Sequence, residues 1–234
     1  MYQYNIQIGM GHIGRDGNLK LGAAIDLLQN GSWFQMDTEK GLGEYFAKTD
    51  TGVYIASRQV DINRFPRYGE KVNIKVWISS CEKIWGHRST VMYDDQGEVC
   101  MASSSLGVFV DLKSGRPTRI PPAVIDHIKL EPPFAMELMP RKIEVTGAAV
   151  QMEGIKVQKY HLDSYGHVNN ARYIDMAESC LPEDFSVRRI RVEYKNPALL
   201  NEMVWPRVYK QDGKIIVSLD RTDGAAYAVV EAVE

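Results

Sequence analysis

The chain has 234 residues, of which 44% are hydrophobic and 25% charged, and its formal net charge is -2. This composition is that of an ordinary globular protein, and the near-neutral balance argues against a nucleic-acid-binding protein. Three widely spaced cysteines without a CxxC pair argue against a disulfide framework and favour a reducing cytoplasm, and no apolar run approaches the roughly 20 residues of a membrane span.

The first half of the chain is expected to hold a strand, an enclosed helix and an antiparallel meander. Residues 2–8 alternate like a strand, and the first ten residues lack the basic flank and apolar core of a signal peptide. The apolar stripe from Leu21 to Phe34 is too wide for a surface helix; Gly31 could kink this helix, and Gly41 to Gly43 are expected to end it. Four strands joined by turns should follow, near residues 52–63, 70–82, 85–94 and 98–111.

The second half repeats this order after a proline-rich segment. Residues 113–140 hold six of the ten prolines and are expected to be a linker with one short helix at 122–129. A strand at 151–160 should lead through a loop into an amphipathic helix from about Val168 to Pro182. Four more strands are expected, near residues 187–195, 203–210, 213–220 and 225–232.

The two halves therefore look like copies of one unit. A shift of 149 residues places His12 on His161 and Gly17 on Gly166, and it superimposes the two helices. The identity is weak, but the order of elements is the same. The sequence predicts an α+β fold in which each half wraps an antiparallel sheet around a central helix.

A polar loop precedes the second helix and carries the candidate catalytic residues, Asp163 and His167. The start of a helix has unpaired amides and a partial positive charge, so it favours a polarised carbonyl or an anion. Structural alternatives remain open, with Asp163 as a turn or cap residue and His167 as a buried, hydrogen-bonded group. A metal site formed with His161 is a weaker alternative, and Cys180 lies about 20 Å along the helix, too far to pair with His167.

Over nearly its whole length the chain resembles the fatty acyl-ACP thioesterases of plants and bacteria. Residues 64–122 are similar to the family's pattern from its Arg-Tyr-Pro element to the proline-rich linker, and residues 167–170 match its hallmark His-Val-Asn-Asn. The resemblance implies a double hotdog fold. The N-terminal hotdog, 1–112, would form the acyl-chain tunnel, and the C-terminal hotdog, 141–234, would carry the catalytic loop.

The resemblance also implies an activity, namely hydrolysis of fatty acyl-ACP to free fatty acid, which ends chain elongation in fatty acid biosynthesis. The partner would be the acyl carrier protein, and neither a metal nor another cofactor is implied. Asp163 and His167 would be catalytic: the imidazole orients or deprotonates water, and the carboxylate fixes its tautomer or acts as the base. Tyr165, Asn169 and Asn170 would support the oxyanion region at the helix start.

The acyl chain and the carrier would contact other parts of the chain. Tunnel candidates on the first helix are Ala24, Leu28, Trp33 and Phe34, with Met36 near the same end; these residues can form core and tunnel wall together. Basic residues that could dock an acidic carrier, or form a solvated strand face, are Lys156, Lys159, Arg172, Arg188, Arg189 and Arg191.

Two residues depart from the family's pattern. Tyr165 stands where the family has asparagine, and Pro197 stands where it tends to have glutamate. These departures motivate a second hypothesis, a catalytically degenerate acyl-binding module, beside a third, an acyl-CoA thioesterase of the same fold. A hotdog dehydratase is disfavoured, because no matching His and acid pair is found. Acyl chain length, carrier and oligomeric state, including a homodimer, stay open.

Overall fold

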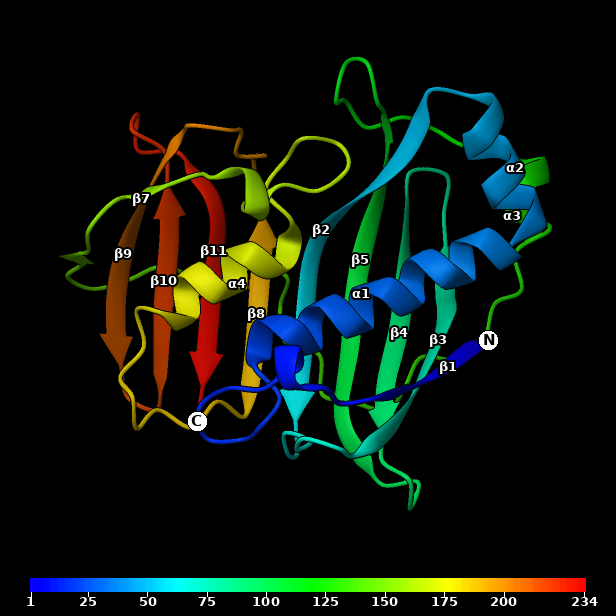
Figure 1. The fold of residues 1–234 in the computed structure, drawn as a ribbon. Helices are drawn as coiled ribbons and strands as arrows, with labels where there is room; N and C mark the ends of the chain where they lie inside the picture. Colours follow the sequence, from blue (N-terminus) through cyan, green and yellow to red (C-terminus); the bar gives the residue numbers. More distant parts are fainter. The chain divides into compact units, whose positions relative to one another are not determined.

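The computed structural model describes residues 1–234, except for the side chain of Lys40. The chain divides into two compact units, Met1–Leu138 and Met139–Glu234. In each unit an antiparallel sheet packs against one main helix (Figure 1). Of the helices that the structure describes, none combines the length and apolar character needed to cross a bilayer.

The first unit is built on a five-stranded antiparallel sheet in the order β1-β3-β4-β5-β2. Helix α1 (Leu21–Thr38) lies across one face of this sheet. Its buried stripe includes Ala24, Ile25 and Leu28, as the apolar spacing predicted. The strands are β1 (Tyr2–Gln7), β2 (Thr51–Ile62), β3 (Lys71–Cys81), β4 (Trp85–Tyr93) and β5 (Val99–Asp111).

The end of the first helix differs from the prediction. Helix α1 stops at Thr38, and a second helix, α2 (Lys40–Lys48), runs through Gly41 and Gly43. These glycines serve close packing instead of termination, because a Cβ at Gly41 would meet His127 Cβ at 3.2 Å and one at Gly43 would meet the Met36 carbonyl oxygen at 3.0 Å.

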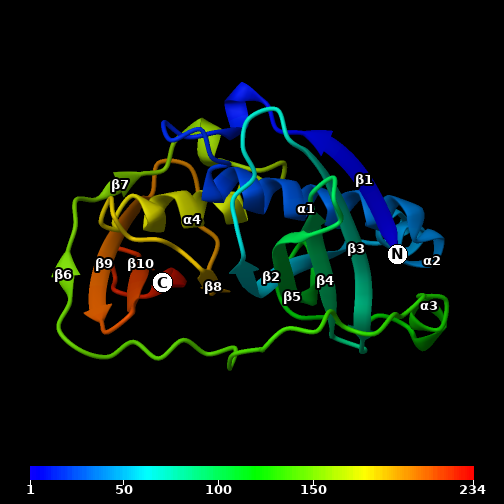
Figure 2. The same cartoon turned by 90° about the horizontal axis from the view of Figure 1, so that it is seen from below.

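The proline-rich segment packs in two places: Ile120 and Ile128 join the core cluster of Met36 and Leu42, and residues 130–138 lie on the sheet of the first unit, on the face opposite α1 (Figure 2). The indole Nε1 of Trp77 donates to the carbonyl oxygen of Pro132 at 2.8 Å, and Phe134 packs against Trp77, Val91 and Ala102. The short helix α3 (Pro122–Ile125) ends four residues earlier than expected. Residues 130–138 therefore cover apolar side chains that would otherwise face water.

The second unit repeats the pattern with the strand order β8-β11-β10-β9-β6, and α4 (Asn170–Glu178) lies across one face. The predicted strand at 151–160 is wrong: it is replaced by two short pieces, because Gly154 sits against the Trp205 ring, where a Cβ would come within 2.7 Å. The strands are β6 (Val150–Gln151), β7 (Ile155–Lys156), β8 (Arg189–Tyr194), β9 (Met203–Gln211), β10 (Lys214–Asp220) and β11 (Ala226–Val233).

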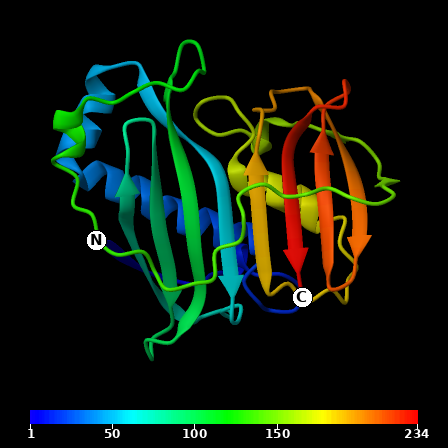
Figure 3. The ribbon, with the colours of Figure 1, turned by 180° about the vertical axis from the view of Figure 1, so that it is seen from behind.

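The outer face of the second sheet is covered in the same way (Figure 3). Ile143 packs there against Tyr209, Ile216 and Val229. Because β7 also pairs with β9, the order β7-β9-β10-β11-β8 of the second sheet matches the order β1-β3-β4-β5-β2 of the first. Each unit therefore has the hotdog arrangement. The predicted α+β fold, with one helix and one antiparallel sheet per copy, is confirmed.

Candidate active site

The polar loop of the second unit is a closed turn between the 3-10 turn Lys159–His161 and α4. The Asp163 amide donates to the His167 carbonyl at 2.7 Å, and the Gly166 amide donates to the Asp163 carbonyl at 3.1 Å. Gly166 has φ +77°, which a side chain would strain. The turn therefore holds Asp163 and His167 opposite each other at its neck.

The Asp163 carboxylate stabilises this turn. Its Oδ1 accepts the Tyr165 amide at 2.8 Å and the His167 amide at 3.1 Å. Among the described residues, Oδ2 has no hydrogen-bond donor. Asp163 is half-buried, so one oxygen orders the loop while the other can meet a further group.

The main chain of His167 is fixed from several sides. Besides its two contacts with Asp163, His167 pairs with Leu199, and the next amide, that of Val168, donates to the Ala198 carbonyl at 2.9 Å. The loop is thus joined to the segment that follows Pro197. His167 itself is half-buried, at the junction of the two segments.

The start of α4 is capped by its own asparagine. Asn169 Oδ1 accepts the Ala171 amide at 2.8 Å, and the Asn169 carbonyl accepts the Arg172 amide at 2.9 Å. The Asn170 carbonyl accepts the Tyr194 hydroxyl at 3.1 Å. The helix begins two residues later than predicted, and an oxyanion that bound Ala171 would compete with the cap.

Two polar residues near the loop were not predicted. The buried Tyr173 hydroxyl accepts the Ala198 amide at 2.8 Å, and burial, with a smaller contribution from Asp163, raises the pKa of this phenol. Glu202 Oε2 accepts the Leu199 amide at 2.8 Å and the Tyr227 hydroxyl at 2.9 Å. A carboxylate therefore orders the segment after Pro197, although the expected position holds proline.

The alternative metal site is not formed. His161 Nδ1 accepts the Gln158 amide at 3.0 Å, so this ring caps the 3-10 turn. Burial, followed by the charge of Arg172, lowers the pKa of His161. Within the part of the chain that the structure describes, no three His, Cys, Asp or Glu side chains are placed to hold one ion.

The first unit contains the same turn before α1, built on different side chains. Its Gly14 amide donates to the Asn18 carbonyl at 2.8 Å, and Gly17 has φ +78°. His12 Nδ1 accepts the Gly9 amide at 3.1 Å, as His161 does for Gln158. The predicted shift of 149 residues therefore relates two loops with one backbone conformation.

The comparison of the two loops separates chemistry from structure. Gly14 stands at the position of Asp163, and Asn18 at that of His167. In the first loop Asp16 orders the turn instead, since its Oδ1 accepts the Asn18 amide at 3.1 Å. This turn can therefore form without the acid and imidazole that the second copy carries.

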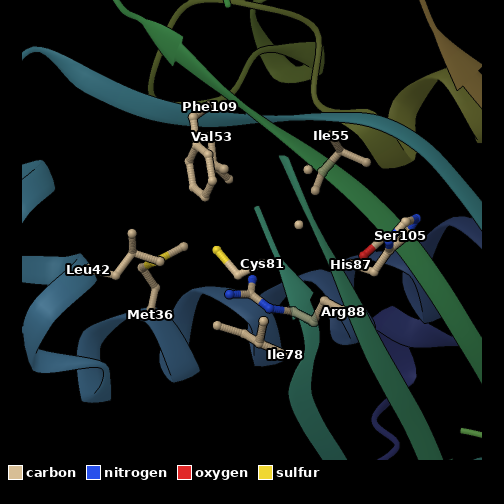
Figure 4. A pocket seen from close by; sticks show the side chains of 12 residues that line it. Met36, Leu42, Val53, Ile55, Ile78, Cys81, His87, Arg88, Ser105 and Phe109 are labelled. Atoms are coloured by element: carbon tan, nitrogen blue, oxygen red, sulfur yellow. The ribbon is translucent and has the colours of Figure 1, made fainter. Parts of the chain in front are cut away.

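A cavity lies between helix and sheet of the first unit, lined by residues of α1, α2 and β2–β5 (Figure 4). Of the predicted tunnel residues, Met36 lines it, whereas Ala24, Leu28, Trp33 and Phe34 do not. Ala24 and Leu28 are fully buried in the core, whereas Trp33 and Phe34 are 39% and 41% exposed. Phe34 packs edge-on against Tyr4 at 5.3 Å between ring centroids.

The predicted basic patch is smaller than expected. Arg191 is buried, with Nε donating to Glu231 Oε1 at 2.7 Å and Nη1 donating to the Pro140 carbonyl at 2.7 Å. It is therefore not available for docking a partner. Arg172 pairs with Asp175 at 2.6 Å, while Lys156, Lys159 and Arg188 are exposed.

Comparison with known proteins gives consistent matches. Residues 1–128 match the family model of the acyl-ACP thioesterase N-terminal domain, and residues 146–221 match that of the C-terminal domain. The chain is 26% identical over 198 residues to a chloroplastic palmitoyl-acyl carrier protein thioesterase of Cuphea hookeriana, covering 78% of this chain and 48% of that protein. The chain spans about half the length of the curated relatives it matches.

Solved structures agree on the fold. An acyl-ACP thioesterase from Bacteroides thetaiotaomicron superimposes with a TM-score of 0.88 at 18% identity, covering 99% of this chain and 96% of that one. The 12:0-ACP thioesterase from Umbellularia californica gives a TM-score of 0.85 at 17% identity, with the same coverage. The double hotdog prediction is thereby confirmed.

Proposed function

The chain belongs to the acyl-ACP thioesterase family, and we propose that it hydrolyses the thioester of a fatty acyl-ACP and releases free fatty acid. One observation carries the assignment of the site. The two units share a turn, but only the second places a carboxylate and an imidazole, Asp163 and His167, at its neck. Since the first turn forms with Gly14 and Asn18 at these positions, this backbone conformation does not itself require an acid and an imidazole there.

In the proposed reaction His167 takes a proton from water as the water oxygen attacks the thioester carbonyl carbon. Imidazole is suited to this step because it exchanges protons near neutral pH. The tetrahedral intermediate collapses, the C–S bond breaks, and the sulfur takes the proton held by His167 and leaves as the carrier's free thiol. Asp163 Oδ1 holds the His167 amide at 3.1 Å, and the carboxylate thereby positions the base.

The oxyanion of the intermediate would form beside the start of α4. The partial positive charge of the helix N-terminus favours negative charge there, and preorganised donors at such sites are typically worth about 3 kcal/mol each. Tyr165, Asn169 and Asn170 border this region in the chain. Tyr165 is 45% exposed and is the side chain placed where the family's pattern has asparagine.

The proposed partner is an acyl carrier protein, docked in part by charge. Lys156, Lys159 and Arg188 supply exposed positive charge in the same unit as the catalytic loop. Carrier proteins are acidic, so opposite charge would speed their encounter. All three cysteines are free, and we place the reaction in a reducing compartment such as the cytoplasm.

The experiment is to follow free thiol and free fatty acid together from a panel of acyl-ACPs and the matching acyl-CoAs. The proposal expects equal amounts of both products, and faster turnover of the ACP substrates. Faster turnover of the CoA substrates would instead favour the acyl-CoA thioesterase. Tight binding of acyl-ACP without release of thiol would reject hydrolysis and leave a degenerate acyl-binding module.

A further inference from the structure

Arg88 of β4 is an unusual residue for an acyl-chain cavity. It lines the cavity of the first unit beside apolar side chains such as Met36, Ile78 and Phe109. Its Nη1 donates to the Ser32 carbonyl at 3.2 Å, but its Nε is buried without a hydrogen-bond partner. Among the described residues no carboxylate pairs with it. A buried cation without a paired anion is costly, so its presence needs an explanation.

Polar atoms without partners continue from Arg88 along α1. Ser32 is 6% exposed and Gln35 is 1% exposed, and the Ser32 hydroxyl and both polar atoms of the Gln35 amide lack hydrogen bonds. These residues lie on the buried stripe of α1, one turn apart, and Met36 next to them lines the cavity. Native proteins rarely leave several buried polar atoms unpaired at one place.

The cavity is partly open to solvent. With its mouth and the adjoining solvent included, its empty space is about 410 Å³. Figure 4 shows the guanidinium end of Arg88 extending into this space toward Cys81. The accessible part of the Arg88 surface thus faces the cavity, with the rest of the side chain packed in protein. An acyl chain with an apolar tip would leave this guanidinium end without a partner in the cavity.

A second arginine strengthens the positive potential. Arg58 of β2 and Arg88 of β4 both pair with Ser105 of β5, so the three residues form one row across the sheet. Arg58 is 4% exposed. Burial lowers the pKa of Arg88 to about 10; Glu39 acts to raise it, and Arg58 lowers it further. Negative charge in the cavity would therefore be favoured.

We propose that the cavity selects acyl chains that carry an oxygen acceptor, a carboxylate or a hydroxyl, toward the end distant from the thioester, with Arg88 as the residue that binds it. This inference rests on the proposed function for the acyl nature of the ligand. With Nη1 engaged by Ser32 and Nε buried, Nη2 is left to donate to the oxygen of a carboxylate or a hydroxyl. A hydrogen bond from a guanidinium is charge-assisted and therefore stronger than a neutral one.

The test measures binding of acyl-pantetheines in which an amide replaces the thioester, by isothermal titration calorimetry, so it does not depend on hydrolysis and the plain probes carry no carboxylate. The acyl groups are octanoyl, decanoyl and dodecanoyl, with the ω-hydroxy and ω-carboxy derivative of each length. Wild-type protein should bind the oxygenated probe of the best length about tenfold more tightly than the plain probe, as expected for one charge-assisted hydrogen bond. Equal or weaker binding of the oxygenated probes would overturn the inference.

Variants assign the preference to its residues. Arg88→Met should abolish the preference or reverse it, whereas Arg119→Met, an exposed arginine of the same unit, should keep it. If Arg88→Met does not fold, as judged by its thermal unfolding, Arg88→Gln serves in its place and should weaken the preference for the ω-carboxy probes, because glutamine is polar but uncharged. A preference that survives in every folded variant would contradict the role of Arg88.

The outcome is distinguishable from failure of the proposed function. If the protein prefers the oxygenated probes but hydrolyses no thioester, the cavity assignment is retained and the hydrolase is rejected. If it hydrolyses plain acyl-ACPs and shows no preference in binding, the hydrolase is retained and the cavity assignment is rejected.

Discussion

Replacing Asp163 in two ways separates its chemistry from its structural contribution. Asp163→Ala removes both the charge and the acceptor for the Tyr165 and His167 amides. Asp163→Asn removes the charge but keeps an acceptor oxygen of nearly the same shape. If the carboxylate is needed for the reaction, both variants should lose turnover, although they should differ in stability.

The magnitudes follow from the two hydrogen bonds to Oδ1, at 2.8 and 3.1 Å. Bonds to a charged acceptor contribute about 1.5–3 kcal/mol and neutral ones about 0.5–1.5 kcal/mol, with lower values for a half-exposed turn. We therefore expect Asp163→Asn to lower the free energy of unfolding by about 1 kcal/mol and Asp163→Ala by about 2–3 kcal/mol. Turnover should fall about 10²–10⁴-fold in both.

The assays are urea unfolding and thiol release from acyl-ACP. The matched controls are Asp16→Asn and Asp16→Ala, because Asp16 orders the equivalent turn of the first unit through the Asn18 amide. These controls should lose stability while keeping turnover. Wild-type turnover in Asp163→Asn would refute the reasoning, and so would an equal loss of turnover in the Asp16 variants.

Three further outcomes follow from the structure. Gly166→Ala should lower the free energy of unfolding by about 1 kcal/mol and reduce turnover, because the left-handed backbone strains a side chain. Gly17→Ala, at the equivalent left-handed position of the first unit, should lower stability without reducing turnover. Equal turnover in the two variants would argue against the assignment of the catalytic loop. Burial acts to raise the pKa of Glu231, but the ion pairs with Arg191 and Lys214 hold this pKa below its usual value. These pairs therefore stabilise the fold fully above the pKa of glutamate in the unfolded chain, about 4.3. The stabilisation is lost as the pH falls through the lower pKa of the folded protein. Glu231→Gln should cost about 3 kcal/mol at neutral pH and flatten this part of the acid unfolding curve; an unchanged curve would show that the pairs contribute nothing. The KM for acyl-ACP should rise with salt if charge guides docking, and a KM that does not change between low and high salt would remove the basic residues from recognition.

Local sequence patterns were enough to predict most of the fold. Alternation and turn residues located nine of the strands. β1 alternates between half-buried and exposed residues, whereas β10 and β11 are buried on both faces and were located by the turns beside them. The errors lie where contacts between residues distant in sequence determine the local structure. Gly41 and Gly43 sit inside α2 because they pack against His127 and Met36, and Gly154 splits a strand because it meets Trp205. Nothing in the neighbouring residues signals these contacts.

The sequence also predicted only those residues of the candidate site that lie close together in the chain. Asp163 and His167 lie four residues apart in a glycine-bearing loop, so sequence alone brings them together. Tyr173 and Glu202 act through Ala198 and Leu199, which only the folded chain places beside the loop. An arginine in a strand is usually exposed, so Arg88 gave no signal of a cavity residue.

The central claim is that the thioester carbonyl reacts beside Asp163 and His167. The most direct measurement is a crystal structure of the protein with an acyl-pantetheine in which an amide replaces the thioester. The account predicts that the amide carbonyl carbon lies within reach of the His167 ring through one water molecule, with its oxygen at the start of α4. A carbonyl bound at the turn of the first unit, or beyond the reach of both side chains, would contradict it.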